Sequence, residues 1–474
     1  MMTLILFLGV FVSHAFEATI GYIPKTLPRD PVEINLFLEH AIVGQVLETL
    51  IKIDTDGNVA PGLAEKWEIT QNGHQFIFTL RSGLVFSDGS KLTSEDVLYS
   101  LGRHQQSTIS QSKGYFDNVQ EMKVLSPLQF QITLKQPQVA LLKILTRDHL
   151  GIVPKGWVFK KDAESPWIGT GPYVLMKRKD HYYLEKNPRY RDESKVRVSS
   201  WKILQSDDVL ADHAKLEIPD VIMHIPDHVQ DGLRADKKYA KMNFYRPLHF
   251  IQTSAWWYPL GKNHKDQLLQ SVVTSALDEL VQELVKTNGH ELATGIIPKG
   301  ISGYLPSRKA LKTAEKLKAQ RVVKVAVTPN DFEPLFGSGL HKKLEAKYNI
   351  LFEIHKMLPG DKLKELAPDV YVAAYAGGFP DPDGFMIVLT SILGQDFKTF
   401  LGPLAPLYTK AQSALEWTER TRLFKELGEA MLEKKLLVPL WKKDMYVAIG
   451  ERVVDSDALF KYSLRLHEFD YRSP

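Results

Sequence analysis

The stretch HQFIFTLRSGLVFSDGSKLTSEDVLYSLGR, residues 74–103, carries the clearest fold signal in the chain. Phe76, Phe78 and Leu80 lie on one face of an extended chain, a period-two pattern that predicts a strand. Arg81-Ser82-Gly83 follows and predicts a turn, because glycine punctuates regular structure. The stretch therefore starts with a strand that has one buried face.

The second half of this stretch predicts a turn and then a helix. Val85-Phe86 predicts a short second strand, and Asp88-Gly89 predicts another turn. Thr93 is placed to begin a helix, because Asp96 three residues later can accept hydrogen bonds from free backbone donors. The helix then carries two apolar residues one turn apart, Val97 and Leu101. None of these features requires a function.

This order of residues resembles the family 5 extracellular solute-binding proteins, the dipeptide, oligopeptide and nickel receptors of ABC transporters. Their sequences carry F-x-D-G-x-x-L-T-A-x-D-V and a helix that ends in Arg. The matching residues in this chain are Phe86, Asp88, Gly89, Leu92, Thr93, Asp96, Val97 and Arg103.

Further segments resemble the same family in the same order along the chain. They are PGLAEKWEIT (61–70), IGTGPYVL (168–175), EKNPRY (185–190), VVTSALD (272–278, with Val273 where the family has Arg) and ERTRLFKELGEAMLEKKLLVPLW (419–441). Each match alone is weak, but together they span nearly the whole mature chain.

The resemblance implies an α/β fold of the type II periplasmic-binding-protein kind, with two lobes around a cleft and an extra subdomain inserted in the first lobe. A chain of 474 residues also exceeds the roughly 250–300 residues of one hydrophobic core. The expected parts are a first lobe of 16–44, 165–245 and 455–474, an inserted subdomain of 45–164 and a second lobe of 246–454. Hinges are expected near Arg246–Phe250 and near Ala448–Val454.

Two segments at the start of the first lobe have their own patterns. ATIGYIP, residues 18–24, predicts an opening strand. NLFLEHAIVGQVLETLIKI, residues 35–53, predicts a helix, because Leu36, Ile42, Val46 and Leu50 share one face.

The N-terminus resembles a secretory signal peptide. The apolar run LILFLGVFV at 4–12 precedes Ser13-His14-Ala15, with small residues at the −3 and −1 positions of a cleavage site after Ala15. We therefore expect residues 1–15 to be removed and the chain to be exported to the periplasm. No Lys or Arg precedes the run, so a buried first strand is the alternative.

Composition excludes several kinds of site. The chain has no cysteine, which excludes disulfides, thiolate catalysis, Cys-ligated metals and lipid attachment through Cys. Lys and Arg number 60 against 56 Asp and Glu, and a net charge of +4 does not favour nucleic acid as a partner.

Enzyme and metal motifs are also missing. His290-Glu291 lacks the second His of a zinc motif, and residues 54–65 have Val59 where a calcium loop needs Gly. We expect no cofactor and no metal.

The segment YVAAYAGGFPDPDGFM, residues 371–386, holds the candidate chemistry of the second lobe. Asp381 and Asp383 are candidates for an acid/base pair, but the sequence around them is strong turn chemistry. The segment also resembles the family loop W-x-x-D-Y-P-D-P-x-x-F, which implies a position at the cleft. Tyr375 takes the place of the Trp, and Phe379 starts the Y-P-D-P match.

One departure from the family pattern concerns the ligand. In the peptide-binding members, the Asp of this loop pairs with the α-ammonium of the peptide, and this chain has Gly378 there. A buried ammonium without a carboxylate partner is strongly unfavourable. Either Asp381 or Asp383 substitutes, the alignment is shifted by one residue, or the ligand lacks that amine.

Other candidate ligand-binding residues follow from the resemblance. They are His40, Ala41 and Ile42 near a backbone that pairs with extended peptides, Tyr115 and Phe116 in the inserted subdomain, and Trp256, Trp257 and Tyr258 after the first hinge. The alternative for Trp256, Trp257 and Tyr258 is an exposed loop cluster or packing inside a lobe.

The resemblance implies a monomeric periplasmic receptor that captures a small solute, with peptide as the leading class, and delivers it to the membrane permease of an ABC transporter. No catalysis is expected. The alternatives are a sensor or chaperone with the same fold, a receptor for a nickel chelate, opine, sugar or capped peptide, and an exported hydrolase that uses Asp381 and Asp383.

Overall fold

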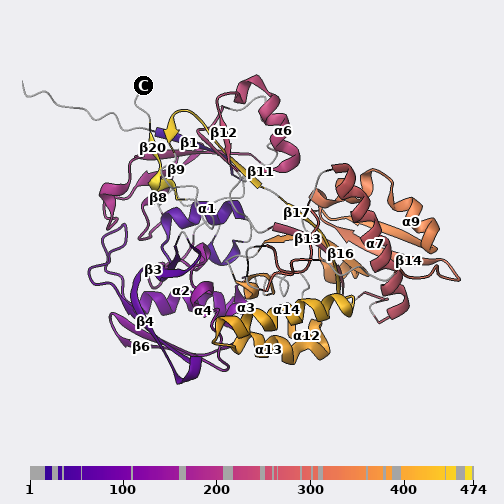
Figure 1. Cartoon of the computed structure of the whole chain (residues 1–474). Helices are drawn as coiled ribbons and strands as arrows, with labels where there is room; N and C mark the ends of the chain where they lie inside the picture. Colours follow the sequence, from indigo (N-terminus) through magenta and orange to yellow (C-terminus); the bar gives the residue numbers. More distant parts are fainter. Residues whose placement is uncertain are drawn as a thin grey trace, which may run out of the picture.

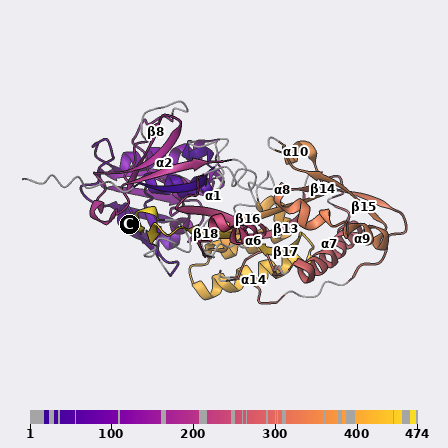
Figure 2. The same cartoon turned by 90° about the horizontal axis from the view of Figure 1, so that it is seen from above.

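The structure is a computed structural model. It describes residues 17–23, 30–34, 37–54, 56–107, 110, 112–159, 167–206, 217–245, 251–258, 261–263, 265–288, 291–299, 301, 303–307, 313–358, 361–376, 381–386, 397–443, 445–454 and 465–471. Figure 1 shows two parts, one built mostly from the N-terminal half of the chain and one mostly from the C-terminal half. Figure 2 shows them side by side along the long axis of the molecule.

The first part contains a seven-stranded mixed sheet. Its strands, in spatial order, are β12 (Asn243–Tyr245), β18 (Met445–Ile449), β11 (Val221–Pro226), β1 (Glu17–Ile23), β10 (Ser200–Gln205), β9 (His181–Lys186) and β8 (Tyr173–Arg178). The central strand β1 is parallel to both of its neighbours, and the other pairs are antiparallel. Segments from both ends and from the middle of the chain thus meet in one sheet.

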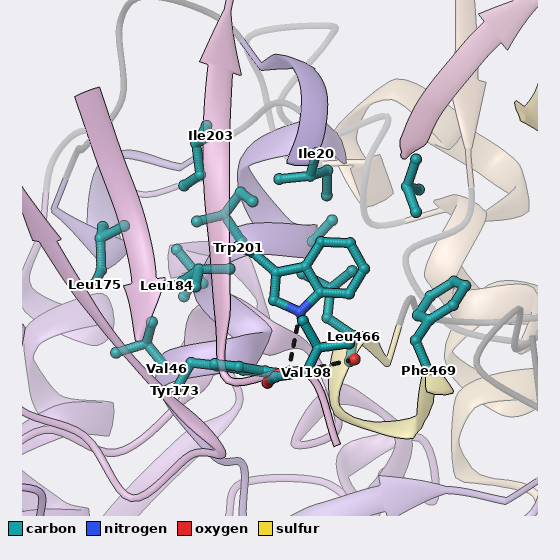
Figure 3. Close-up of a cluster of buried hydrophobic side chains, with 14 of the residues drawn as sticks. Ile20, Val46, Tyr173, Leu175, Leu184, Val198, Trp201, Ile203, Leu466 and Phe469 are labelled. Atoms are coloured by element: carbon teal, nitrogen blue, oxygen red, sulfur yellow. Dashed lines mark hydrogen bonds between the residues drawn. The ribbon is translucent and has the colours of Figure 1, made fainter. Parts of the chain in front are cut away.

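Tyr173 and Trp201 lie at the centre of the core on one face of this sheet (Figure 3). The indole Nε1 of Trp201 donates to the Tyr173 hydroxyl at 3.1 Å, and that hydroxyl donates to the Val198 carbonyl oxygen at 3.0 Å. Each buried polar atom is therefore paired inside an apolar core. The C-terminal tail closes the same core, because the ring of Phe469 lies 5.7 Å from that of Trp201.

The remaining elements near this sheet are short. They are η1 (Pro31–Glu33), α1 (Phe37–Val46), η4 (Glu193–Lys195), α6 (Asp227–Ala235), η5 (Lys237–Tyr239), β19 (Val453–Val454), η8 (Leu466–Glu468) and β20 (Asp470–Tyr471). The prediction of a helix over 35–53 was too long, since α1 ends at Val46 and the chain is extended from Ile51. Leu50 is buried and continues the apolar spacing, but residues 51–53 pair with β3 instead.

A second body of the first part lies between β1 and β8 in sequence. It has a four-stranded antiparallel sheet in the order β4 (Ala64–Thr70), β5 (Gln75–Leu80), β7 (Gln129–Leu134) and β6 (Val119–Ser126), and a separate hairpin of β2 (Ile51–Ile53) and β3 (Val59–Pro61). Its helices are η2 (Gln71–Gly73), α2 (Ser94–Gln106), α3 (Lys113–Phe116), α4 (Leu141–Ile144) and η3 (Asp148–Leu150).

The stretch 74–103 folds here largely as its pattern predicts. Phe76 and Phe78 are buried on one face of β5, and the Asp96 carboxylate accepts the Thr93 backbone N–H at 2.7 Å at the start of α2. The predicted short strand at 85–86 was wrong, since Val85 makes only an isolated bridge to Lys91. Phe86 is nevertheless buried in the core, and packing rather than pairing explains its apolar side chain.

The second part has a five-stranded mixed sheet. Its order is β15 (Ile350–Lys356), β14 (Arg321–Val327), β16 (Val370–Ala376), β13 (Ile251–Trp257) and β17 (Leu437–Lys443). The helices of this part are α7 (Gln267–Asn288), α8 (Pro329–Phe332), η6 (Glu333–Gly337), α9 (His341–Tyr348), α10 (Leu363–Leu366), α12 (Phe397–Leu401), η7 (Gly402–Leu404), α13 (Ala405–Ser413) and α14 (Trp417–Glu433). Figure 1 shows α7 and α9 on one side of this part and α12, α13 and α14 on another.

The chain crosses between the two large sheets twice. The first crossing joins β12 to β13 through residues 246–250, where a hinge is expected; those residues lie outside the described part. The second crossing lies between Lys443 and Met445, because β17 and β18 belong to different sheets. It is a few residues earlier than the expected hinge at Ala448–Val454, since Ala448 already pairs inside the first sheet. The expected domain boundaries otherwise stay predictions.

Candidate functional site

The candidate aromatic residues of the second part lie in its interior. Trp256, Trp257 and Tyr258 are 0%, 4% and 1% exposed. Trp256 packs edge-on to Tyr375 with ring centroids 5.6 Å apart, and Trp257 lies in a separate core cluster. The structure therefore brings three of these four residues, Trp256, Tyr258 and Tyr375, into one core cluster, and all four are packed inside the lobe. Contact with a solute stays a prediction for them.

Tyr375 is also fixed by a hydrogen bond. Its hydroxyl donates to the Ile296 carbonyl oxygen at 3.0 Å. Its ring lies 6.3 Å from that of Phe385, the residue that closes the 371–386 segment. Gly378 and Phe379 lie outside the described residues, so their predicted roles are neither supported nor opposed by the structure.

Asp381, Asp383 and Arg420 form a buried cluster, the acid–arginine cluster. The Arg420 Nη2 atom donates to Asp381 Oδ1 at 2.7 Å and to Asp383 Oδ2 at 3.0 Å. Its Nη1 atom donates to the carbonyl oxygens of Ala411 and Gln412 at 2.8 and 3.2 Å. The guanidinium of α14 thus ties the 381–383 turn to the end of α13.

The turn itself explains the spacing of the two acids. Asp381 Oδ1 accepts the backbone N–H of Asp383 at 3.0 Å, the local hydrogen bond by which Asp sets a turn. Burial raises the pKa of Asp383, while Arg420 opposes that shift. Burial lowers the pKa of Arg420, but the two carboxylates outweigh it and the net shift is upward. The cluster is a structural group in which one internal cation, Arg420, binds an oxygen atom of each of the two acids.

The candidate residues of the first part also include residues packed in a hydrophobic core and residues of a polar cluster. Ala41 and Ile42 are buried in the core of the seven-stranded sheet, and Phe116 is buried in the core of the four-stranded sheet. Tyr115 belongs to that core too, but both it and His40 lie beside Arg147 in a polar cluster. Sequence reasoning placed them in different bodies of the first lobe, and the structure brings them together.

Three histidines form the centre of that polar cluster, the histidine cluster His40, His104 and His149. The Nδ1 atoms of His40 and His149 are 3.1 Å apart, so one donates and the other accepts. His149 also pairs with Ser112, and His104 pairs with Ser110 at 3.0 Å. Burial lowers the pKa of His40 and of His104 to about 3, and that of His149 falls well below its ordinary value. All three rings are therefore neutral at pH 7.

Arg147 is the cation next to the histidine cluster, and sequence reasoning missed it. Its guanidinium carbon lies 5.4 Å from the centroid of the Tyr115 ring. Its charge contributes to lowering the pKa values of His40, His104 and His149. No motif marks this position, because its neighbours come from α1, α2 and α3 and are far away in sequence.

Lys143 connects the two groups of candidate residues. It lies on α4, and its Nζ atom is 3.9 Å from Asp381 Oδ2. The same atom lies 5.1 Å from the centroid of the Trp417 ring at the start of α14. The inserted body of the first part and the acid–arginine cluster of the second part are therefore in contact.

The described residues contain no group of three or more His, Asp or Glu that could hold a metal ion. The calcium-loop segment is a hairpin turn, because Asp54 Oδ1 accepts the backbone N–H groups of Asp56 and Asn58 at 3.0 and 2.8 Å. Within the described part of the chain, no helix is both long and apolar enough to cross a membrane.

Comparison with known proteins assigns the chain to a family. The model of the bacterial extracellular solute-binding proteins, family 5 Middle, matches residues 58–395. The chain belongs to this family. The prediction made from the motifs around residues 86–103 is thus confirmed, and family 5 proteins are receptors for solutes.

Three relatives illustrate the range of the family. "Periplasmic oligopeptide-binding protein OppA" of Salmonella typhimurium is 21% identical over 87% of this chain and 84% of its own length. "Probable deoxycholate-binding periplasmic protein YgiS" of Escherichia coli is 27% identical over 47% of this chain, and the match covers 48% of that relative. The solved structure of the binding protein AgaA from A. tumefaciens R10, in complex with agropinic acid, has a TM-score of 0.79 at 18% identity and covers 97% of this chain and 99% of its own.

These comparisons confirm the predicted fold class, a two-lobed α/β periplasmic binding protein. In this family 5 protein, the two large sheets are the cores of the two lobes. The body of β2 to β7 with α2, α3 and α4 lies where the inserted subdomain is expected.

Proposed function

We propose that this family 5 protein is a periplasmic receptor that captures a small solute, peptide or peptide-like, between its lobes and delivers it to the permease of an ABC transporter. The observation that carries the proposal is the arrangement of two sheets joined by two chain crossings, with Lys143 and Asp381 in contact across the junction. An arrangement of this kind supports hinge closure around a ligand.

The mechanism follows from the two crossings. The inserted subdomain moves with the first lobe, and α14 with the acid–arginine cluster moves with the second. A solute that contacts both lobes binds the closed form more tightly than the open form, and this difference in affinity sets how far the population shifts. The permease then distinguishes the closed receptor from the open one.

We propose no catalytic role for Asp381 and Asp383. Both carboxylates accept hydrogen bonds from Arg420, and Asp383 is fully buried. An acid/base pair needs one oxygen within reach of a substrate proton. This geometry supports a structural role over the hydrolase alternative.

The pairing of Asp381 and Asp383 with Arg420 also concerns the chemical class of the solute. Because Asp381 and Asp383 are buried and already accept hydrogen bonds from Arg420, these acids are poor replacements for the carboxylate that is missing at position 378. This supports a solute that is not anchored here by a free α-ammonium, such as a capped peptide or a non-peptide compound. A sensor with the same fold is the alternative function. It would bind the same solute and would differ only in its protein partner.

Small-angle X-ray scattering tests the proposal on the mature protein. The protein is stripped of bound solute and titrated with the small-molecule fraction of a periplasmic extract. We expect the radius of gyration to decrease and to reach a plateau as the lobes close. A radius that does not change with any fraction of the extract would contradict the proposed function.

A further inference from the structure

The turn between α13 and α14 of the second lobe lies against the inserted subdomain (Figure 1). A Cβ atom added to Gly73 of η2 would lie 3.1 Å from Leu415 Cδ2 and 3.3 Å from Pro137 Cβ. Leu415 belongs to the turn, whereas Gly73 and Pro137 belong to the inserted subdomain. The Leu415 side chain therefore forms an apolar contact between the two lobes.

Trp417, at the start of α14, makes a second contact with the same subdomain. The Lys143 Nζ atom of α4 lies 5.1 Å from the centroid of the Trp417 ring and 3.9 Å from Asp381 Oδ2. An ammonium group that lies over a Trp ring and near a carboxylate is attracted by both. One apolar and one ionic contact thus join the same two parts of the molecule.

The acid–arginine cluster holds this turn in place within the second lobe. Arg420 Nη1 donates to the carbonyl oxygens of Ala411 and Gln412 in α13, at 2.8 and 3.2 Å. Arg420 Nη2 donates to Asp381 Oδ1, and the other oxygen of Asp381 faces Lys143. The cluster therefore fixes the position of the surface that meets the inserted subdomain.

Both large apolar side chains of the turn are half-exposed. Leu415 is 53% exposed and Trp417 is 54% exposed, whereas Trp256 in the core of the same lobe is fully buried. A half-buried apolar contact changes an equilibrium constant by a few-fold rather than by several orders of magnitude. The contact is therefore strong enough to shift the balance between open and closed forms, and weak enough to break when the lobes separate.

We propose that the turn at 414–417 is a latch, the lobe latch, which stabilises the closed form by binding the inserted subdomain at Gly73, Pro137 and Lys143. These contacts join side chains of the chain itself, so they act separately from the contacts with the solute. The apparent affinity of a receptor rises with the fraction of molecules in the form that binds. The inference rests on the proposed function and specifies how closure, and with it the affinity for the solute, is regulated.

Two variants test the lobe latch, one at each contact. Leu415→Ser removes the apolar contact, and Lys143→Gln removes the charge while it keeps most of the side-chain stem. Leu268→Ser is the control, because Leu268 is 65% exposed at the start of α7, which Figure 1 shows on the side of the second lobe away from the first.

Small-angle X-ray scattering of the mature protein, stripped of bound solute, gives the first readout. We expect both stripped variants to have a larger radius of gyration than the stripped wild-type protein, because a larger fraction is open. Titration with the small-molecule fraction of a periplasmic extract gives the second readout. We expect the extract concentration at half-maximal contraction to rise about 3- to 10-fold for Leu415→Ser and about 2- to 5-fold for Lys143→Gln. The control should keep the wild-type values in both readouts.

The comparison of stripped proteins requires no solute, so the inference and the proposed function fail separately. An extract that never contracts the wild-type protein contradicts the proposed function. Stripped variants with the wild-type radius overturn the lobe latch, and the receptor function stands if the wild-type protein contracts. A raised half-maximal concentration at an unchanged stripped radius also overturns the latch, because it assigns the residue to direct contact with the solute. If one variant does not fold, the other still decides the inference.

Discussion

Arg420 is the side chain of the second lobe that donates hydrogen bonds to two buried acids, Asp381 and Asp383. Its guanidinium is 1% exposed and joins α13, α14 and the 381–383 turn. Removal of one partner from a buried ionic group leaves the others unpaired, which is far more unfavourable than loss of an exposed pair. The residue is therefore expected to matter for stability rather than for solute contact.

We predict that Arg420→Gln lowers the free energy of unfolding by about 3–5 kcal/mol, because two carboxylates remain buried without their cation. The control is Arg422→Gln on the same helix, where the exposed side chain pairs with Glu419 and Glu426. The control is expected to change stability by about 1 kcal/mol or less. Urea unfolding at pH 7 measures both, and equal effects would contradict a structural role for the acid–arginine cluster.

The histidine cluster predicts that the free energy of unfolding depends on pH. Burial, with help from Arg103 and Arg147, lowers the pKa of His104 to about 3 from 6.5. Between these values the unfolded chain binds a proton that the folded chain does not. Each such group therefore destabilises the fold by about 1.4 kcal/mol per pH unit as the pH falls from 6.5 towards 3.

We predict that His104→Gln reduces this dependence. Between pH 7 and pH 5, the variant should lose about 2 kcal/mol less stability than the wild-type protein, whatever its stability at pH 7. His181→Gln on β9, where the side chain is exposed, serves as the control and should keep the wild-type slope. An unchanged slope in His104→Gln would mean that His104 is protonated in the folded protein.

At the scale of the elements, the start of helix α2 is the feature that the sequence predicts best. Asp96 accepts the Thr93 backbone N–H and hydroxyl through Oδ2, and the Lys155 backbone N–H through Oδ1 at 2.7 Å. Its carboxylate thus caps the helix and holds the following loop.

We predict that Asp96→Asn lowers the free energy of unfolding by about 1–2 kcal/mol, through loss of charge-assisted hydrogen bonds at a helix start. The control is Asp88→Asn in the preceding turn, where the carboxylate is exposed and accepts only from Ser90 in the described structure. That change is expected to fall within about 0.5 kcal/mol. Chemical denaturation distinguishes the two, and a larger effect of the control would refute the capping argument.

Element by element, sequence reasoning succeeded where the signal was local. The alternation of Phe76 and Phe78 and the spacing of Thr93 and Asp96 depend on neighbours within one turn or one strand. The helix over 35–53 was extended too far because Leu50 keeps the apolar period after α1 has ended. The spacing of apolar residues shows which side chains are buried. Burial alone does not show where a helix ends and the following strand begins.

The candidate site was predicted less well for the same reason. Trp256 and Trp257 signal apolar surface, but only the fold decides whether that surface faces a solute or a core. Arg147 and Arg420 were missed because their partners lie on other elements. Family resemblance supplied His40 and Tyr115, and the structure added the cation between them.

At the scale of the whole molecule, the contact of α4 with α14 is one link between the inserted subdomain and the second lobe. The chain has no cysteine, so a pair of engineered cysteines can report on this contact alone. We predict that Lys143→Cys with Trp417→Cys, joined by a short bis-maleimide, holds the lobes closed. Co-purified solutes should then leave the protein at least about 10-fold more slowly during dialysis, because opening must precede release.

The two single-cysteine variants treated with the same reagent are the controls. They should release solutes at the wild-type rate, measured by native mass spectrometry of samples taken during dialysis. Equal rates in the crosslinked protein would show that solutes leave without separation of α4 from α14.

Native mass spectrometry of the mature protein, purified gently from a periplasmic extract, tests the central claim most directly. The account predicts that the protein carries non-covalent small molecules, that these are released on activation, and that their masses identify a small solute. A protein that carries no small molecule, and that acquires none when returned to the extract, would contradict its role as a solute receptor.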